Sequence, residues 1–384
     1  MTWRRAQSHS EQVRQKAHVC AGCDDLTDSG APARYLRRAL LRGAVFESGD
    51  ADRELLAQRP ATAATVVSGV LTEVTSQAIV VKGSDGGDQF LALSPGTVSW
   101  LGARVSTSAL RVGDPVIVRH RTHRLIPSGP AGAGGTAGAG GAAGAGGPAG
   151  AGPVASIAER IWARIGRVTG AIVAVRGPDI LVDTGQQGRE PQHVVIAEAS
   201  MRHVQVRFPR LEPGYLIDVI GTRHHDYLLA VAPATTAQPP YLADHPPAAP
   251  PASGHFSGPI SGTAVWHEPG DEPDGLMGLG YAALDPETEA QQIGPRASDQ
   301  VQPCVRLPYL SLGSAVRITN ECADRAAVLP VTSASVSARQ FCDRCVTCGT
   351  SPRGRIADLT MAAFVELGGN LEEGCFNATL TLAN

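Results

Sequence analysis

Short hydrophobic runs alternate with polar segments between residues 65 and 120. Runs of β-branched residues at 66–67, 79–81 and 116–118 are separated by polar, glycine-containing segments such as 84–87. Runs of this length, bounded by turn-forming residues, are typical of β-strands. The pattern therefore predicts a small all-β module in this part of the chain.

The same pattern returns later in the chain at a constant spacing. A fixed offset between matching positions indicates an internal repeat, and we therefore predict a duplicated β-module. In each copy a turn that contains a leucine and a glycine is expected to precede the last strand. The landmark positions recur 101 residues further on: Gly69 as Gly170, Ile79 as Ile180, Val81 as Val182 and Gly113 as Gly214.

Each copy resembles a small oligonucleotide/oligosaccharide-binding (OB) type barrel, because it has five short predicted strands and this glycine turn. Such barrels bind single-stranded nucleic acid through aromatic side chains in a basic groove. The first copy offers only Phe90 and Trp100 as aromatic residues, and the chain carries 33 Lys and Arg against 36 Asp and Glu. This charge balance disfavours nucleic acid as a partner, so a role as spacer or adaptor is preferred.

Two segments of biased composition divide the chain. One is almost pure glycine, alanine and proline, which predicts a flexible linker, and the other is rich in proline, which predicts a stiffer one. We expect a mainly β protein with six parts: a polar, arginine-rich N-terminal segment (1–64), β-barrel module 1 (65–128), a Gly/Ala linker (129–153), β-barrel module 2 (154–231), a Pro-rich linker (232–259) and a C-terminal barrel (260–384).

Six of the eight cysteines lie in the C-terminal part of the chain. An even, dense set of cysteines predicts a disulfide framework in an oxidising compartment, with the pairing left open. A zinc site is the alternative, but the usual pair of Cys-x-x-Cys motifs is absent. We therefore expect no metal and no cofactor. The disulfide candidates are Cys304, Cys322, Cys342, Cys345, Cys348 and Cys375, and the zinc alternative would use Cys342, Cys345 and Cys348.

The cysteines favour an extracellular or cell-envelope location. Residues 1–16 are nevertheless polar and do not show the apolar segment of a signal peptide. The apolar runs of the chain are also too short to cross a bilayer, so no transmembrane segment is expected.

The C-terminal part carries the most specific motifs in the chain. In order, they are Gly-x-Ala-x-Trp at 262–266, Leu-x-x-Gly-Ser-x-Val-x-Ile-Thr-Asn at 310–320, Asp-x-Cys-x-x-Cys at 343–348 and Asp-Leu-Thr-x-x-Ala-Phe at 358–364. Read together, they resemble the double-psi β-barrel of expansins, barwin-like proteins and rare lipoprotein A. The resemblance covers about a third of the chain and implies a barrel with a polysaccharide-binding groove.

The resemblance assigns four residues to that groove. Asp343 matches the groove aspartate of the expansin and barwin pattern, Asp358 matches the aspartate of the family's Asp-Leu-Ser segment, and Trp266 matches the aromatic residue of the opening strand. Carboxylates accept hydrogen bonds from sugar hydroxyls and a flat aromatic ring stacks on sugar rings. Arg355 is expected to bind an acidic glycan or, preferably, to pair with Asp358. Two readings without a ligand remain open: Asp358 as a helix cap and Trp266 as a core residue.

The catalytic pattern of rare lipoprotein A is not retained. Residues 332–335 read Thr-Ser-Ala-Ser in place of that family's Asn-Asp-Arg-Gly-Pro segment, and Leu307 stands where its histidine is expected. We therefore predict non-hydrolytic binding or loosening of a cell-wall polysaccharide, either peptidoglycan or a plant or microbial wall glycan. This pattern favours a protein without enzyme activity but leaves an enzyme as an alternative. The alternatives are a lytic transglycosylase that uses Asp343 or Asp358 as general acid, and an OB-type module that binds nucleic acid or protein.

Overall fold

The computed structural model describes ten stretches of the chain. The N-terminal segment, the whole predicted Gly/Ala linker, most of the Pro-rich linker and several loops of the C-terminal part lie outside them. The described residues are 65–84, 86–124, 154–185, 190–235, 258–268, 275–285, 307–335, 337–340, 342–343 and 353–382.

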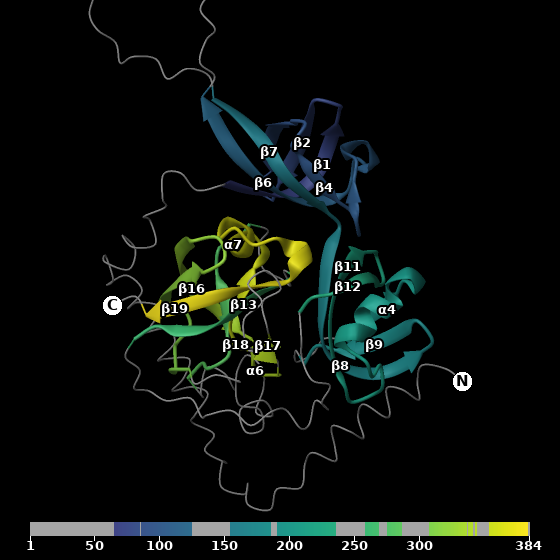
Figure 1. The fold of residues 1–384 in the computed structure, drawn as a ribbon. Helices are drawn as coiled ribbons and strands as arrows, with labels where there is room; N and C mark the ends of the chain where they lie inside the picture. Colours follow the sequence, from purple (N-terminus) through teal and green to yellow (C-terminus); the bar gives the residue numbers. More distant parts are fainter. Residues whose placement is uncertain are drawn as a thin grey trace, which may run out of the picture.

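The first barrel is built from seven strands (Figure 1). The sheet runs in the order β3-β2-β1-β6-β7-β4-β5, and a parallel pairing of β3 with β7 closes the ring. A 3-10 turn, η1 (Thr107–Ala109), precedes β6. The strands are β1 (Thr65–Val74), β2 (Ala78–Gly83), β3 (Asp88–Ala92), β4 (Val98–Trp100), β5 (Arg104–Val105), β6 (Pro115–Arg124) and β7 (Val154–Ala163).

The second barrel has five strands and one helix. Its closed order is β10-β12-β11-β8-β9, with a parallel pairing of β10 and β12. Buried aliphatic side chains such as Ile172, Val182 and Val219 fill the interior. The elements are β8 (Ile165–Arg176), β9 (Asp179–Asp183), β10 (Gln192–Ile196), α4 (Glu198–Arg207), β11 (Leu216–Arg223) and β12 (Leu228–Pro233).

The two barrels share connectivity and register at the spacing found in the sequence. Gly113 N donates to Leu71 O, and 101 residues later Gly214 N donates to Ile172 O, both at 2.8 Å. Both glycines adopt a positive φ, 93° and 91°, which L-residues with a side chain rarely adopt. The origin of the two barrels by duplication stays a prediction, but their matched contacts are those that such a repeat requires.

The strand assignment differs from the sequence analysis at one boundary. β7 follows the Gly/Ala segment, yet it pairs along its length with β6 and therefore belongs to the first barrel. The second barrel begins only at Ile165, and Arg164, with a φ of 51°, is the single residue between β7 and β8. Residues 125–153 thus connect two strands of one barrel. The glycine turn precedes β6 in the first barrel and β11 in the second, and one further strand, β7 or β12, follows. It therefore does not precede the last strand, as the sequence analysis expected.

A close backbone approach in the second barrel gives a testable prediction. A Cβ at Gly170 would fall onto the carbonyl oxygen of Asp183, far inside van der Waals contact, whereas a Cβ at Gly177 would meet nothing within 4 Å. Gly170→Ala is therefore expected to lower the free energy of unfolding by about 3 kcal/mol. Gly177→Ala should cost only about 1 kcal/mol, because its one penalty is the positive φ of 61°. Urea unfolding of the two variants checks this difference.

The third barrel is formed by the C-terminal part of the chain. Six strands close in the order β13-β19-β15-β16-β14-β18 through a parallel pairing of β13 with β18, and β17 extends β18. β14 and β16 form a second parallel pair. The elements are β13 (Ile260–His267), β14 (Leu279–Tyr281), β15 (Ala315–Asn320), β16 (Arg325–Ala334), α6 (Ser337–Gln340), β17 (Cys342–Asp343), β18 (Arg353–Thr360), α7 (Met361–Glu366), η2 (Leu371–Glu373) and β19 (Cys375–Leu382).

The expected mainly β architecture of small barrels is confirmed. The disulfide framework stays a prediction, because Cys304, Cys345 and Cys348 lie outside the described residues and nothing is described of the Cys342 side chain. Cys322 follows β15, and Cys375 is buried at the start of β19. Within the described stretches, no helix is long and apolar enough to cross a membrane.

The three barrels are packed against one another through a shared hydrophobic cluster. Trp162 of the first barrel, Ile220 of the second and Trp266 of the third belong to the same set of buried residues. Arg160 on β7 also pairs with Glu372 of the third barrel, 2.6 Å between Nη1 and Oε1. The described parts of the three barrels are therefore in direct contact. They are not separated in space by linkers.

Candidate functional site

A carboxylate at the edge of the third barrel has the most unusual polar environment. Asp358 lies near the end of β18, opposite Val265 of the parallel strand β13. Its Oδ2 atom accepts hydrogen bonds from Ser335 Oγ at 3.0 Å and Ser337 Oγ at 2.8 Å. Its Oδ1 atom lies 3.4 Å from Nδ1 of His267. We call these four residues, Asp358, Ser335, Ser337 and His267, the Asp358 site.

The two carboxylate oxygens of Asp358 differ in how well they are satisfied. Oδ1 is buried and accepts no hydrogen bond within the described part of the chain, although Oδ2 accepts two. A buried oxygen without a donor is costly, and such atoms are uncommon in folded proteins. Side chains of the site reach the surface: His267 is 24% exposed and Asp358 10%. The group that faces Oδ1 is Nδ1 of His267, which also lies 3.1 Å from the backbone oxygen of Asp358.

Nearby positive charge keeps Asp358 ionised. Burial on its own raises the pKa of the carboxyl group, but the imidazole of His267 and the guanidinium groups of Arg167 and Arg355 lower it by more. The net pKa therefore lies well below the ordinary range for an aspartate. At neutral pH the group is a hydrogen-bond acceptor and carries no proton to donate.

Asp358 is not the cap of helix α7. The N-cap is Thr360, whose Oγ1 accepts a hydrogen bond from the backbone N of Ala363 at 3.4 Å. The sequence analysis considered Asp358 for this role because it precedes the helical run, and that prediction was wrong. The Asp358 side chain is consequently available to the serines and the histidine.

Trp266 does not form a stacking surface. Its side chain is only 1% exposed, its Nε1 donates to Leu371 O at 2.9 Å, and it belongs to the shared hydrophobic cluster. The guanidinium of Arg167 lies 5.6 Å from the centroid of its ring. The expectation that Trp266 binds a sugar ring is therefore corrected. This tryptophan is part of the core, which the sequence analysis had left open as the alternative.

Arg355 is also removed from any ligand surface. It is fully buried at 0% exposure, and its Nη2 atom pairs with Asp218 of the second barrel. The sequence analysis expected it to bind an acidic glycan or to pair with Asp358. Neither holds, because the partner comes from a different barrel, which packs over this strand.

Asp343, the other candidate carboxylate, lies in β17, where it is paired with Arg353 of β18. Nothing is described of its side chain, so its place in the groove stays a prediction. The structure thus brings Asp358 together with three residues that the motif did not single out. His267 directly follows the Gly-x-Ala-x-Trp motif, which is the one sequence signal that pointed near it.

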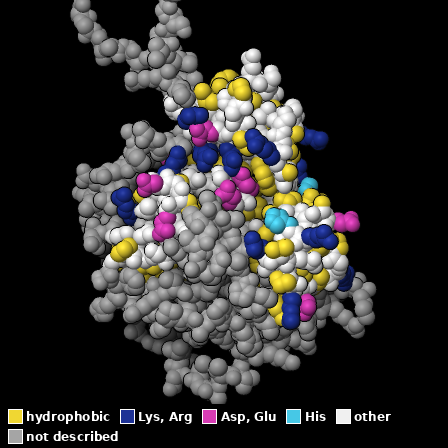
Figure 2. All heavy atoms as spheres, in the orientation of Figure 1, with side chains coloured by type: hydrophobic (Ala, Val, Ile, Leu, Met, Phe, Trp, Pro, Cys, Tyr) yellow, Lys and Arg dark blue, Asp and Glu magenta, His cyan; other side chains and the backbone are white. Residues whose placement is uncertain are grey.

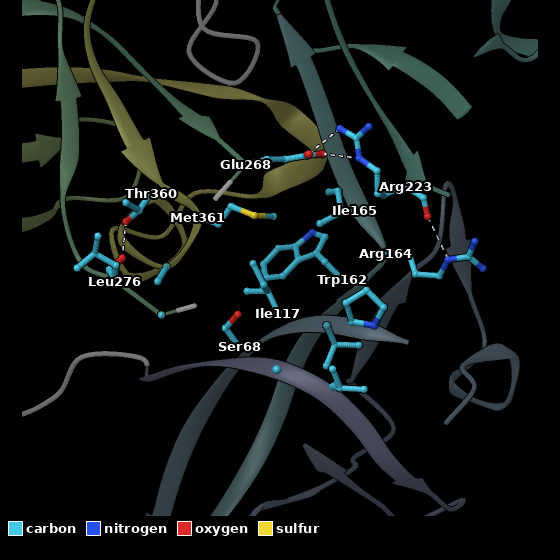
Figure 3. A pocket seen from close by; sticks show the side chains of 16 residues that line it. Ser68, Ile117, Trp162, Arg164, Ile165, Arg223, Glu268, Leu276, Thr360 and Met361 are labelled. Atoms are coloured by element: carbon cyan, nitrogen blue, oxygen red, sulfur yellow. Dashed lines mark hydrogen bonds and ion pairs between the residues drawn. The ribbon is translucent and has the colours of Figure 1, made fainter. Parts of the chain in front are cut away.

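A cavity of about 230 Å³ lies where the three barrels meet (Figure 3). Trp162, Ile117 and Met361 contribute apolar walls, and an ion pair between Arg223 and Glu268, with 2.6 Å between Nη2 and Oε2, lies at one side. Burial raises the pKa of Glu268, against the opposing effect of Arg223. Arg223 and Glu268 neutralise each other, whereas Arg164, which also lines the cavity, lies within hydrogen-bond distance of Arg223 O at 3.3 Å and His224 Nδ1 at 3.0 Å.

The surface of the first two barrels provides little for nucleic acid. Trp100 is buried at 7% exposure, which leaves Phe90, at 67%, as the exposed member of the pair named from the sequence. On the face seen in Figure 2, several basic side chains lie in a row, with acidic side chains directly beside it. A stacking platform in a basic groove is not evident on this face.

No family model matches the chain, and no curated protein matches its sequence.

Proposed function

We propose that the third barrel binds a polysaccharide without cleaving it, and that the Asp358 site is where sugar hydroxyls are held. The observation that carries this proposal is the ionised carboxylate of Asp358, which is 10% exposed and whose Oδ1 atom has only the ion pair with His267 among the described residues. Hydrogen bonds from hydroxyl groups to carboxylates are among the stronger ones in proteins. A polyhydroxylated chain is the ligand class that this oxygen suits.

The protonation state of Asp358 argues for binding over cleavage. A general acid must hold a proton near the working pH, and enzymes that cleave glycosidic bonds by acid catalysis raise the pKa of that carboxyl group. Arg167, Arg355 and His267 have the opposite effect on Asp358. The lytic alternative, with Asp358 as general acid, is therefore disfavoured.

The barrel topology supports an expansin-like mode of action. Six strands with two parallel pairs, β13 with β18 and β14 with β16, are compatible with a double-psi barrel. The resemblance assigns Asp358 to the groove of such a barrel. The same proposal includes three further points: the ligand is a cell-wall polysaccharide, the protein is located in the cell envelope or outside the cell, and this barrel contains disulfide bonds. The first two barrels would act as adaptors.

The test is a pull-down of the full chain, produced under oxidising conditions, on insoluble peptidoglycan, cellulose and chitin. We expect binding to at least one of them, with no soluble sugar released. Asp358→Asn, which keeps the shape of the side chain and removes its charge, is expected to weaken that binding about tenfold. Dissociation constants from depletion of the soluble protein give the measurement.

Asp226→Asn is the matched control. It makes the same chemical change at a carboxylate of the second barrel whose side chain is 82% exposed, and its binding should equal that of the wild type. Equal binding by folded Asp358→Asn and by the wild type would refute the proposed site. Release of soluble sugar that depends on Asp358 would restore the lytic alternative.

A further inference from the structure

A buried charge cluster joins the second barrel to the third. Arg167 on β8 donates to Asp218 on β11 through Nε at 2.8 Å and Nη2 at 2.7 Å. Arg355 on β18 of the third barrel pairs with Oδ2 of Asp218, the atom that also accepts from Nη2 of Arg167. The side chains of all three residues are at most 2% exposed. We call Arg167, Asp218 and Arg355 the interbarrel cluster.

Arg167 holds strand β13 on both sides of His267. Its Nη1 donates to the carbonyl oxygen of Trp266 at 2.8 Å, and its backbone N donates to Oε1 of Glu268 at 2.6 Å. The same Nη1 donates to Gly374 O at 2.8 Å, which ties it to the start of β19 as well. His267 therefore lies between two residues that the second barrel fixes in place.

The cluster also fixes the strand that carries Asp358. Arg355 precedes Asp358 by three residues on β18, and its guanidinium is anchored to Asp218. Both strands that supply charged members of the Asp358 site are thus attached to the second barrel through buried, charge-assisted hydrogen bonds. Such bonds are stronger than neutral ones and set geometry more tightly.

The same residues set the charge around Asp358. The charged and titratable groups that act on it are His267 from β13, Arg355 from its own strand and Arg167 from β8, while Ser335 and Ser337 contribute neutral hydroxyls. One of the cationic groups that keep the carboxylate ionised therefore belongs to a different barrel. Removing it should make Asp358 easier to protonate.

We infer that Arg167 and Asp218 of the second barrel are positioning residues for the Asp358 site, so that the site is completed by two barrels. They act through β13 and β18 and contact no ligand. The inference rests on the proposed function for its effect on glycan binding, whereas its effect on Asp358 itself is measured without any ligand. The second barrel is then a structural part of the binding unit and more than a spacer.

The test uses Arg167→Gln in the full chain. We expect glycan binding about tenfold weaker than wild type, because strand β13, which carries His267, loses its anchor to the second barrel. The second measurement is a pH titration of the ligand-free protein followed by carboxyl-carbon NMR. In wild type, Asp358 should stay ionised well below the ordinary aspartate pKa of about 3.9. In Arg167→Gln, its carboxyl group should titrate at a higher pH than in wild type. The Asp358 signal is assigned by its absence from Asp358→Asn.

Two further variants separate positioning from general destabilisation. Arg167→Lys keeps the positive charge and should return the Asp358 titration toward wild type, with only partial recovery of affinity because an ammonium cannot reproduce the guanidinium fork. Arg160→Gln makes the same change as the test variant at an interbarrel pair, with Glu372, that touches neither His267 nor Asp358. It should leave both measurements unchanged.

If Arg167→Gln does not fold, Thr169→Val takes its place in the test. Thr169 Oγ1 donates a hydrogen bond to Asp218 Oδ1 at 2.9 Å. Loss of this hydrogen bond perturbs the interbarrel cluster only mildly. A twofold to threefold loss of affinity at normal thermal stability is then expected, about the effect of one neutral hydrogen bond.

The outcomes distinguish this inference from the proposed function. In the first outcome, wild type and Arg167→Gln bind glycan equally well and the Asp358 titration is the same in both. This result would overturn the positioning role and leave the proposed function intact. Wild-type protein that binds no glycan, with a shifted Asp358 titration in Arg167→Gln, would overturn the function and support the link between the barrels.

Discussion

Asp218→Ala is expected to lower the free energy of unfolding by about 3–5 kcal/mol, the cost of removing one partner from a buried ion pair. Asp218 is fully buried, and its carboxylate is shared by Arg167 and Arg355. The alanine variant leaves the two guanidinium groups facing each other without this counter-charge. Urea unfolding followed by tryptophan fluorescence gives the comparison with wild type.

Asp179→Ala is the matched control for this prediction. Asp179 also pairs with a basic residue, His193, but its side chain is 42% exposed, and solvent-exposed pairs contribute about 0–1 kcal/mol. A loss in Asp218→Ala no larger than that in Asp179→Ala would show that the interbarrel cluster does not stabilise the fold. Replacing Arg167, Asp218 and Arg355 together by Met, Leu and Met should restore much of the loss, because no unpaired charge remains.

The contribution of Asp218 also has a defined pH dependence. Burial raises the pKa of this carboxyl group, but Arg167 and Arg355 lower it by more, so the folded value lies below the unfolded one. Its stabilising effect is therefore complete above the unfolded pKa of about 3.9 and is lost as the pH falls through the lower folded pKa. Asp218→Ala should accordingly lose less stability than wild type on acidification through this range.

Trp266→Ala is expected to cost about 3–5 kcal/mol, typical of truncating a large aromatic side chain in a core. Trp266 is 1% exposed, is hydrogen-bonded to Leu371 and packs within the cluster that unites the barrels. Trp266→Phe should recover most of the packing and lose the hydrogen bond from Nε1. Thermal and urea unfolding of both variants provide the measurement.

The control for Trp266 is Tyr309→Ala on the same barrel. Tyr309 is 44% exposed, so its removal should change the free energy of unfolding by less than about 1 kcal/mol. If Trp266→Ala were as stable as Tyr309→Ala and lost only glycan binding, the assignment of Trp266 to the core would be wrong, and the stacking role implied by the family resemblance would return.

Local patterns identified the strands well, but they could not assign every strand to its barrel. Alternating apolar positions reveal a strand, and glycines with special backbone needs, such as Gly113 and Gly214, mark the turns. The pairing of β7 with β6 joins residues on either side of a Gly/Ala-rich segment. Nothing in that composition shows that the chain returns to the sheet it has just left.

The candidate site was predictable only in part, for a related reason. Asp358 was found because a motif surrounds it. Arg355 and Trp266 were assigned to the ligand surface because their partners, Asp218 and Arg167, lie in another barrel and far away in the sequence. Burial by a neighbouring domain is a long-range property, and a motif read in isolation does not contain it.

The junction between β6 and β7 has a consequence for how this chain tolerates changes in length. Arg124 and Val154 are paired, so residues 125–153 leave and re-enter the first barrel at neighbouring positions. The entropy of closing such a loop grows only with the logarithm of its length, by about 0.6 kcal/mol for each doubling. Insertions, deletions or new chain termini placed there would leave the strand pairs intact, which makes this segment the natural entry point for a fused domain or a circular permutant.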